Sequence, residues 1–157
     1  MASKQSEAFD SGFESKVRES FLRQAFMQHL GAQMAAVRPG ACEIRVPFRA
    51  ELAQQHGYFH AGVSGAIADS ASGYAAYTLM PPQSSVLTVE YKLNLVAPAM
   101  GQGLVARAEV IRNGKTLKIC RADVFAEKDG VETLCATSLS TIMTMFERSD
   151  GPSGKSG

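Results

Sequence analysis

Residues 60–77, HAGVSGAIADSASGYAAY, restrict the possible folds of this chain more than any other segment. The segment contains three glycines, three serines and a single charged residue, Asp69. Its apolar, alanine-rich composition predicts a helix, although each interior glycine lowers helix stability by about 1 kcal/mol relative to alanine. Close packing on most sides of the helix can offset that loss, because small side chains let neighbouring elements approach. We therefore expect a buried helix around which a sheet curves.

The sequence before this segment predicts a helix and a hairpin. Apolar residues at helical spacing indicate a helix over residues 13–30, which Gly31 ends. Residues 32–48 contain the turn Arg-Pro-Gly between two stretches that are typical of strands. The pair Pro81-Pro82 is expected to end the buried helix, because proline cannot continue the helical hydrogen bonds.

After residue 85 the pattern changes to the period of two that is typical of strands. One face is expected to carry Leu87, Val89, Tyr91, Leu93 and Leu95. The opposite face would carry Thr88, Glu90, Lys92 and Asn94. Two more hairpins are indicated by NGK at 113–115 and by EKDGVE at 127–132. The order helix, two strands, buried helix, four strands predicts an α+β fold with an antiparallel sheet.

Length and composition indicate one folded unit. We expect a disordered segment over residues 1–12, one domain over 13–146 and a flexible tail over 147–157. The net charge of +1 gives no reason to expect binding to nucleic acid or to an anionic membrane. Residues 61–80 lack lysine and arginine, but their small residues and Asp69 make them a poor membrane span. The first 16 residues lack a signal-peptide core and the three cysteines are scattered, so we expect a cytoplasmic protein with reduced thiols.

Asp69 is the only formally charged residue between Glu51 and Glu90. A carboxylate in such an apolar segment is costly to bury unless it reaches a cleft or a set of hydrogen-bond donors. One alternative is a surface aspartate on the exposed stripe of the helix. The neighbouring residues form no evident polar stripe, so we favour a functional carboxylate.

Two histidines precede the same helix. His56 and His60 have a spacing that can bind a metal, but no second pair of ligands follows them, so we expect no metal site. His60 could also simply cap the helix or brace the loop before it. The helix start offers free backbone N–H groups to a developing oxyanion, and Asp69 offers a base or a nucleophile. Nine residues, or about 13.5 Å of helix, separate His60 from Asp69. Two antiparallel copies of the helix could join the two groups, which favours a symmetric dimer.

The segment HAGVSGAIAD resembles the H-G-G-x(6)-D signature of hot-dog fold thioesterases of the PaaI type. The sequence VLTVEYKLNLVAPAMGQGLVARAEVIRNGKTLKICRADVF is similar to the sheet region of the same family, so that the resemblance covers roughly residues 50–145. It implies a hot-dog fold, in which a curved antiparallel sheet wraps around a long central helix. It also implies an acyl-CoA thioesterase that needs no cofactor, since coenzyme A is part of the substrate. The implied assembly is a homodimer, and further a tetramer of two dimers.

The resemblance assigns roles to individual residues. The implied catalytic positions are Asp69, Gln54, His60, Ala61, Gly62 and Thr88. Asp69 matches the carboxylate that acts as base or nucleophile, and Gln54 matches an asparagine that helps to hold the thioester carbonyl. His60 matches the motif histidine that orients the loop. The family's oxyanion donor, the N–H after that histidine, falls on Ala61. Ala61 in place of glycine and Gln54 in place of asparagine are departures that bear on substrate preference.

Other residues match positions around the coenzyme A chain. These are Glu90, Arg112, Asn113, Gly114, Lys115 and Thr116. Taken without the resemblance, residues 112–116 are better interpreted as a hairpin turn with solvated charges. Thr88 matches a serine or threonine close to the attacking water or carboxylate. An equally supported alternative is that Thr88 is simply a strand residue on the exposed face.

Two other functions remain open from the sequence. A non-catalytic acyl-CoA or fatty-acid-binding hot-dog protein would gain nothing from a desolvated Asp69. A hot-dog dehydratase or hydratase would need histidine-acid motifs that this sequence does not show. The acyl group could be aromatic or of medium length, and Phe59, Tyr74, Tyr77 and Met80 could line its pocket or simply pack in the core.

Overall fold

The computed structural model describes residue 8 and residues 11–152. The predicted disordered segment 1–12 and the last five residues of the predicted tail therefore lie largely outside the described residues. The main elements are α1 (Phe13–Leu22), α2 (Ala25–Leu30), β1 (Gln33–Arg38), β2 (Ala41–Pro47), α3 (Ala61–Tyr77), β3 (Ser84–Leu95), β4 (Gly103–Asn113), β5 (Leu117–Lys128) and β6 (Val131–Phe146). A short 3-10 helix, Ala50–Leu52, lies between β2 and α3.

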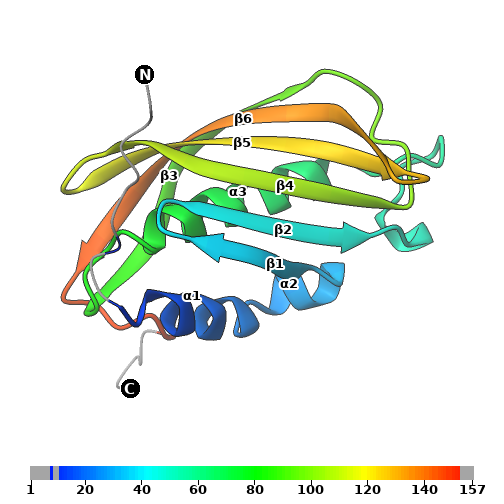
Figure 1. The fold of residues 1–157 in the computed structure, drawn as a ribbon. Helices are drawn as coiled ribbons and strands as arrows, with labels where there is room; N and C mark the ends of the chain where they lie inside the picture. Colours follow the sequence, from blue (N-terminus) through cyan, green and yellow to red (C-terminus); the bar gives the residue numbers. More distant parts are fainter. Residues whose placement is uncertain (1–7, 9–10, 153–157) are drawn as a thin grey trace.

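The six strands form one antiparallel sheet in the order β1-β2-β4-β5-β6-β3. The sheet curves around α3, and α1 and α2 lie along the β1 edge of the sheet, where α1 contacts both α3 and β1 (Figure 1). This arrangement confirms the predicted α+β fold with a curved antiparallel sheet wrapped around a long central helix. β3 is an edge strand, so one of its sides has no strand neighbour among the described residues.

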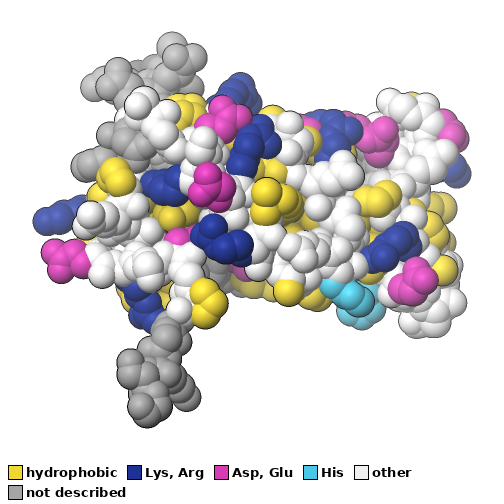
Figure 2. All heavy atoms as spheres, turned by 90° about the horizontal axis from the view of Figure 1, so that it is seen from below, with side chains coloured by type: hydrophobic (Ala, Val, Ile, Leu, Met, Phe, Trp, Pro, Cys, Tyr) yellow, Lys and Arg dark blue, Asp and Glu magenta, His cyan; other side chains and the backbone are white. Residues whose placement is uncertain are grey.

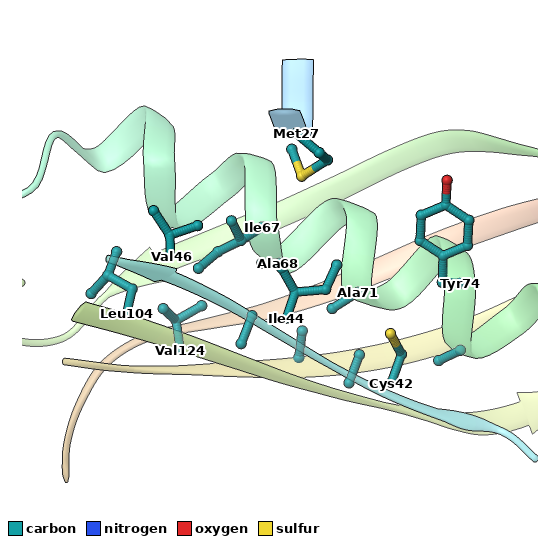
Figure 3. Packing of buried hydrophobic residues seen from close by; sticks show 14 of the residues in the cluster. Met27, Cys42, Ile44, Val46, Ile67, Ala68, Ala71, Tyr74, Leu104 and Val124 are labelled. Atoms are coloured by element: carbon teal, nitrogen blue, oxygen red, sulfur yellow. The ribbon is translucent and has the colours of Figure 1, made fainter. Parts of the chain in front are cut away.

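The core lies on both sides of α3. Ile67 and Ala68 point from the helix toward the sheet, where they meet Ile44 and Val124 (Figure 3). All four of these side chains are fully buried. Met27 of α2 packs on the opposite side of the helix and is 2% exposed. Because α3 is contacted from both sides, its small side chains allow the neighbouring elements to approach the helix closely.

Two glycines show how close this packing is. A Cβ atom added at Gly65 would lie 3.4 Å from the Tyr91 hydroxyl and 3.5 Å from Leu93. A Cβ atom added at Gly73 would lie 3.9 Å from Val86, which is an ordinary contact. The absence of a side chain is therefore needed more at Gly65 than at Gly73. These contacts also show that α3 and β3 run in opposite directions, since the start of the helix faces the end of the strand.

Two predicted element boundaries were wrong. The helix expected over residues 13–30 is broken, because Gln24 is extended with ψ at 97°. The break directs Met27 and Leu30 into the core, while Leu22 and Phe26 stay 66% and 59% exposed. The central helix ends at Tyr77, several residues before the proline pair. The Thr78 hydroxyl donates to the Ala75 carbonyl at 2.7 Å and so caps the last turn.

The prediction that five apolar residues share one face of β3 was also wrong. Thr88 pairs with Ile142 and Glu90 pairs with Thr141, so Val89 is an extra residue that forms a β-bulge. Before the bulge, Val86 and Thr88 face α3, and after it Tyr91 and Leu93 do so. Leu87 and Val89 are 52% and 55% exposed. The bulge reverses the alternation, which a period-two pattern alone does not reveal.

The surface gives two further findings. The face seen from below carries hydrophobic side chains scattered among lysines, arginines and carboxylates, without a field of one sign (Figure 2). Within the described part of the chain, no helix combines the length and the apolar character that a membrane crossing requires.

Candidate active site

The first turn of α3 leaves one backbone donor available. His60 is the N-cap, and its imidazole Nδ1 accepts a hydrogen bond from the Gly62 N–H at 2.8 Å. The Val63 N–H donates to the His60 carbonyl at 2.9 Å. Among the described residues, the Ala61 N–H has no acceptor, and it lies at the positive end of the helix dipole. The His60 ring therefore caps the first turn of α3, and the Ala61 N–H is left without a described acceptor.

Gln54 lies beside this donor. Its side-chain oxygen accepts from the His56 N–H, so its NH₂ group is the part left to donate to a ligand. Its backbone N–H donates to the Tyr58 carbonyl at 2.8 Å, which closes the loop before α3. Gln54 and Ala61 border one cavity of about 440 Å³. The other lining residues are Tyr58, Phe59, Ser64, Leu95, Val96, Ala97, Pro98 and Ala99.

Asp69 lies two turns further along α3 and is partly buried. The Thr88 hydroxyl donates a hydrogen bond of 2.7 Å to Asp69 Oδ1. Burial raises the pKa of the Asp69 carboxyl above its ordinary value, and the hydrogen bond from Thr88 lowers it by a smaller amount. The bulge at Val89 makes this contact possible, since it leaves Thr88 on the helix side of β3. A carboxylate with a raised pKa and one fixed donor is suited to accept a proton from water.

One chain does not bring these two groups together. Eight residues, or about 12 Å of helix, separate Ala61 from Asp69. Asp69 does not line the cavity that holds Gln54 and Ala61. The structure thus places the predicted oxyanion donor and the predicted carboxylate in two half-sites along the same helix.

The residues that resemble coenzyme A positions lie nearer Asp69. Lys118 pairs with Ile142, which pairs with Thr88, so Lys118 lies two strand spacings, or about 10 Å, from Thr88, and the 112–116 hairpin lies beyond Lys118 at the same end of the sheet. Apart from the half-buried Gly114, residues 112–116 are exposed. Glu90 is exposed and accepts a hydrogen bond of 3.1 Å from Thr141. All these positions are open to a ligand, and none borders the cavity at Ala61.

Sequence reasoning missed Ser64 and the loop after β3. Ser64 borders the cavity and is 1% exposed, and its hydroxyl has no hydrogen-bond partner. It lies three residues after Ala61, so the helical period places both on one face. The three-residue spacing between Ala61 and Ser64 was the signal in the sequence that could have identified Ser64. The loop residues 96–99 are far from the helix in sequence and only the sheet brings them to it.

Other parts of the molecule do not extend this site. A cleft of about 860 Å³ lies between α1 and residues 147–151, and Tyr77 lines it, whereas none of the predicted catalytic or coenzyme A positions does. Within the described residues, no cluster of three or more His, Cys, Asp or Glu side chains could hold a metal ion.

Known proteins with a similar sequence share this fold. Residues 56–133 match the family model of the thioesterase superfamily. A crystal structure of a thioesterase family protein from Silicibacter pomeroyi is 44% identical, with a TM-score of 0.85. That match covers 86% of this chain and 99% of the other.

More distant proteins agree with this family. A 1,4-dihydroxy-2-naphthoyl-CoA hydrolase of Listeria monocytogenes is 26% identical over 119 residues, which is 76% of this chain and 94% of that protein. A thioesterase structure from Haemophilus influenzae is 22% identical, with a TM-score of 0.75 over 85% of this chain and 90% of the other, and this likeness concerns the fold alone.

Proposed function

Because this chain belongs to the thioesterase superfamily and is a thioester hydrolase, we propose that it cleaves an acyl-CoA to a free acid and coenzyme A in the manner of PaaI-type enzymes. The observation that carries this proposal is the pair of half-sites on α3. The capped helix start leaves the Ala61 N–H free, and Asp69 is a partly buried carboxylate held by Thr88. A donor for a developing oxyanion and a base are what acyl transfer to water requires.

In the proposed mechanism, the thioester carbonyl oxygen accepts hydrogen bonds from the Ala61 N–H and the Gln54 NH₂ group. Asp69 of the partner subunit takes a proton from a water molecule, and the resulting hydroxide attacks the carbonyl carbon. The tetrahedral intermediate then expels the coenzyme A thiolate. In the alternative route, the carboxylate oxygen of Asp69 attacks the carbonyl carbon directly, the C–S bond breaks and the coenzyme A thiolate leaves, and water then hydrolyses the transient anhydride to the free acid and the Asp69 carboxylate.

Sharing between subunits follows from the distance along α3. About 12 Å separates the two half-sites in one chain, which is too far for both to act on one carbon atom. β3 is an edge strand with exposed apolar residues, including Leu87, Val89 and Leu95. Such an edge favours pairing with a second copy. We propose a homodimer in which two antiparallel helices form two sites, and a tetramer of two such dimers.

The coenzyme A moiety would lie along the 112–116 hairpin and Glu90. Arg112 and Lys115 are exposed, and neither forms an ion pair with a described carboxylate, so both are available to phosphate groups. The aromatic naphthoyl substrate of the Listeria relative and the aromatic Tyr58 and Phe59 beside the cavity are consistent with an aromatic acyl group. A medium-length acyl group remains the other candidate.

The test is release of free thiol from aromatic, short, medium and long acyl-CoAs. Asp69→Asn should lower kcat by a factor of about 10²–10⁴ on the best substrate, because the amide cannot accept the proton. Sedimentation or light scattering should show that the variant keeps the assembly of the wild type. Wild-type turnover in Asp69→Asn would remove Asp69 from the mechanism. Binding of acyl-CoA by the wild type without thiol release would instead indicate a non-catalytic binding protein.

A further inference from the structure

Ser64 has a property that the proposed mechanism does not use. Its side chain is 1% exposed, and its hydroxyl has no hydrogen-bond partner. A buried hydroxyl without a partner lowers stability, and buried polar groups in folded proteins are nearly always paired. Serine hydroxyls inside helices can bond to the carbonyl four residues earlier, but Ser64 does not do so. The Ser64 hydroxyl therefore keeps its full hydrogen-bonding capacity for a ligand that reaches it.

The place of Ser64 indicates where such a ligand would bind. Ser64 borders the 440 Å³ cavity together with Gln54 and Ala61. Side chains on a helix lean toward its N-terminus, so the Ser64 hydroxyl is directed back toward the Ala61 turn. Rotation about its Cα–Cβ bond, which has three staggered positions, is the movement available for turning the hydroxyl toward a bound group.

Ser72 provides an internal comparison. It lies on the same helix, is fully buried, and also has a hydroxyl without a partner. Ser72 is absent from the lining of the cavity that Ser64 borders. The two serines thus share burial and helix, and they differ in access to the candidate site.

The cavity is otherwise suited to an acyl group. Apart from Gln54, Ser64 and the Tyr58 hydroxyl, its side chains are apolar, namely Phe59, Ala61, Leu95, Val96, Ala97, Pro98 and Ala99. A purely hydrocarbon acyl group would fill this space and leave Ser64 unpaired in a dry environment. An acyl group with an additional oxygen would supply the missing partner.

We propose that Ser64 is a specificity-determining residue that hydrogen-bonds to an oxygen atom on the α or β carbon of the acyl group. The three residues from Ala61 to Ser64 span about 4.5 Å of helix, and the backward lean of the side chain shortens this distance. An oxygen on one of the first two carbons after the thioester carbonyl lies within that reach. The inference rests on the proposed function and narrows its substrate class to oxygenated acyl-CoAs.

A site built to bond a substrate oxygen discriminates against the analogue that lacks it, because its own polar group then stays unpaired. The test compares kcat/KM for 3-hydroxybutyryl-CoA and 2-hydroxybutyryl-CoA with that for butyryl-CoA. In the wild type, at least one hydroxylated substrate should be preferred by about tenfold. Ser64→Ala should bring that ratio close to one. Ser72→Ala, the matched control, should keep the wild-type ratio.

A second variant and a binding measurement keep the test decisive. Ser64→Thr retains the hydroxyl and should retain the preference, even if its extra methyl group lowers both rates. Titration calorimetry with the thioethers S-(3-hydroxybutyl)-CoA and S-butyl-CoA measures the same preference without hydrolysis. If the wild type hydrolyses none of the acyl-CoAs, the proposed function fails, whereas the thioether ratio still decides the role of Ser64.

Three outcomes would overturn the proposal. The first is a wild-type preference for butyryl-CoA or no preference at all. The second is a Ser64→Ala protein that keeps both the wild-type rates and the wild-type ratio, which would make the hydroxyl irrelevant to the reaction. The third is an equal loss on all three substrates with an unchanged ratio, which would place Ser64 at the thioester carbonyl instead.

Discussion

The first turn of α3 and its middle differ in chemistry although they belong to one continuous helix. The first turn, together with the loop before it, presents donors: the Ala61 N–H, the Gln54 amide and the Ser64 hydroxyl. The middle presents one acceptor, Asp69, which a single hydroxyl holds. The first turn lacks a carboxylate, and the middle lacks the donors that the first turn presents. The difference fits the proposed mechanism, in which one chain supplies two halves of a reaction centre and a second copy joins them.

Mixing two inactive variants would test this division most strongly. Asp69→Asn lacks the base, and Gln54→Ala combined with Gly62→Ala damages the donor half. Each protein alone should be nearly inactive. Random exchange of subunits at equal concentration should restore about a quarter of the wild-type activity, since half of the dimers would be mixed and each would hold one intact site. Thiol release before and after exchange measures this, and a mixture no more active than its components would show that each site lies within one subunit.

Gly62→Ala should damage the donor half alone. A Cβ atom at residue 62 would lie 2.9 Å from the His60 Nδ1, so the imidazole must move and the N-cap is lost. We expect kcat/KM to fall by about 10–100-fold, because the oxyanion donor loses its fixed position.

Gly73→Ala is the matched control for that change. Its added Cβ atom makes an ordinary contact of 3.9 Å with Val86, and alanine favours the helix. Activity should therefore stay within about twofold of the wild type while Tm rises. Equal rate losses in the two variants would mean that helix packing, not the cap, controls the reaction.

Thr88→Val should weaken the acceptor half by a smaller amount. The lost hydrogen bond had lowered the pKa of Asp69, so this pKa should rise further in the variant. As the pH falls, activity is then lost at a higher pH than in the wild type, with about a tenfold loss at most near neutrality. The pH profile of kcat/KM measures the shift.

A second threonine-aspartate pair serves as the control. The Thr137 hydroxyl donates to Asp123 at 2.6 Å, between neighbouring positions of β5 and β6. Thr137→Val should leave the acidic limb of the profile where it is. An unchanged limb in Thr88→Val would show that Asp69 does not set the pH dependence.

The smallest expected effect concerns stability. Because the fold raises the pKa of Asp69, ionisation of this group costs stability at every pH above the ordinary aspartate pKa. Asp69→Asn should therefore raise Tm by a few degrees near pH 7. The gain should disappear as the pH falls below the ordinary value, where both side chains are neutral. A Tm that is lower at neutral pH would mean that the carboxylate stabilises the fold.

The order of elements could be predicted from the sequence because local signals set it. Asn113-Gly114 and Asp129-Gly130 mark tight turns, and small residues mark the wrapped helix. The break at Gln24 and the bulge at Val89 could not be predicted, since both depend on which side chains reach the core. Asp69 was evident as an isolated charge, whereas the contact with Thr88 depends on the bulge, and the unpaired hydroxyl of Ser64 depends on its surroundings in the fold.

The bulge at Val89 also determines how mutations along β3 should be interpreted. Before residue 89 the even-numbered positions face α3, and after it the odd-numbered positions do. A systematic substitution scan of this strand should therefore change parity at that residue. Deleting one residue at the bulge would restore a regular ladder. It would also move the side chains of half of the strand to the opposite face of the sheet. β3 thus consists of two segments with opposite alternation, one that contacts Asp69 through Thr88 and one that packs against the start of α3.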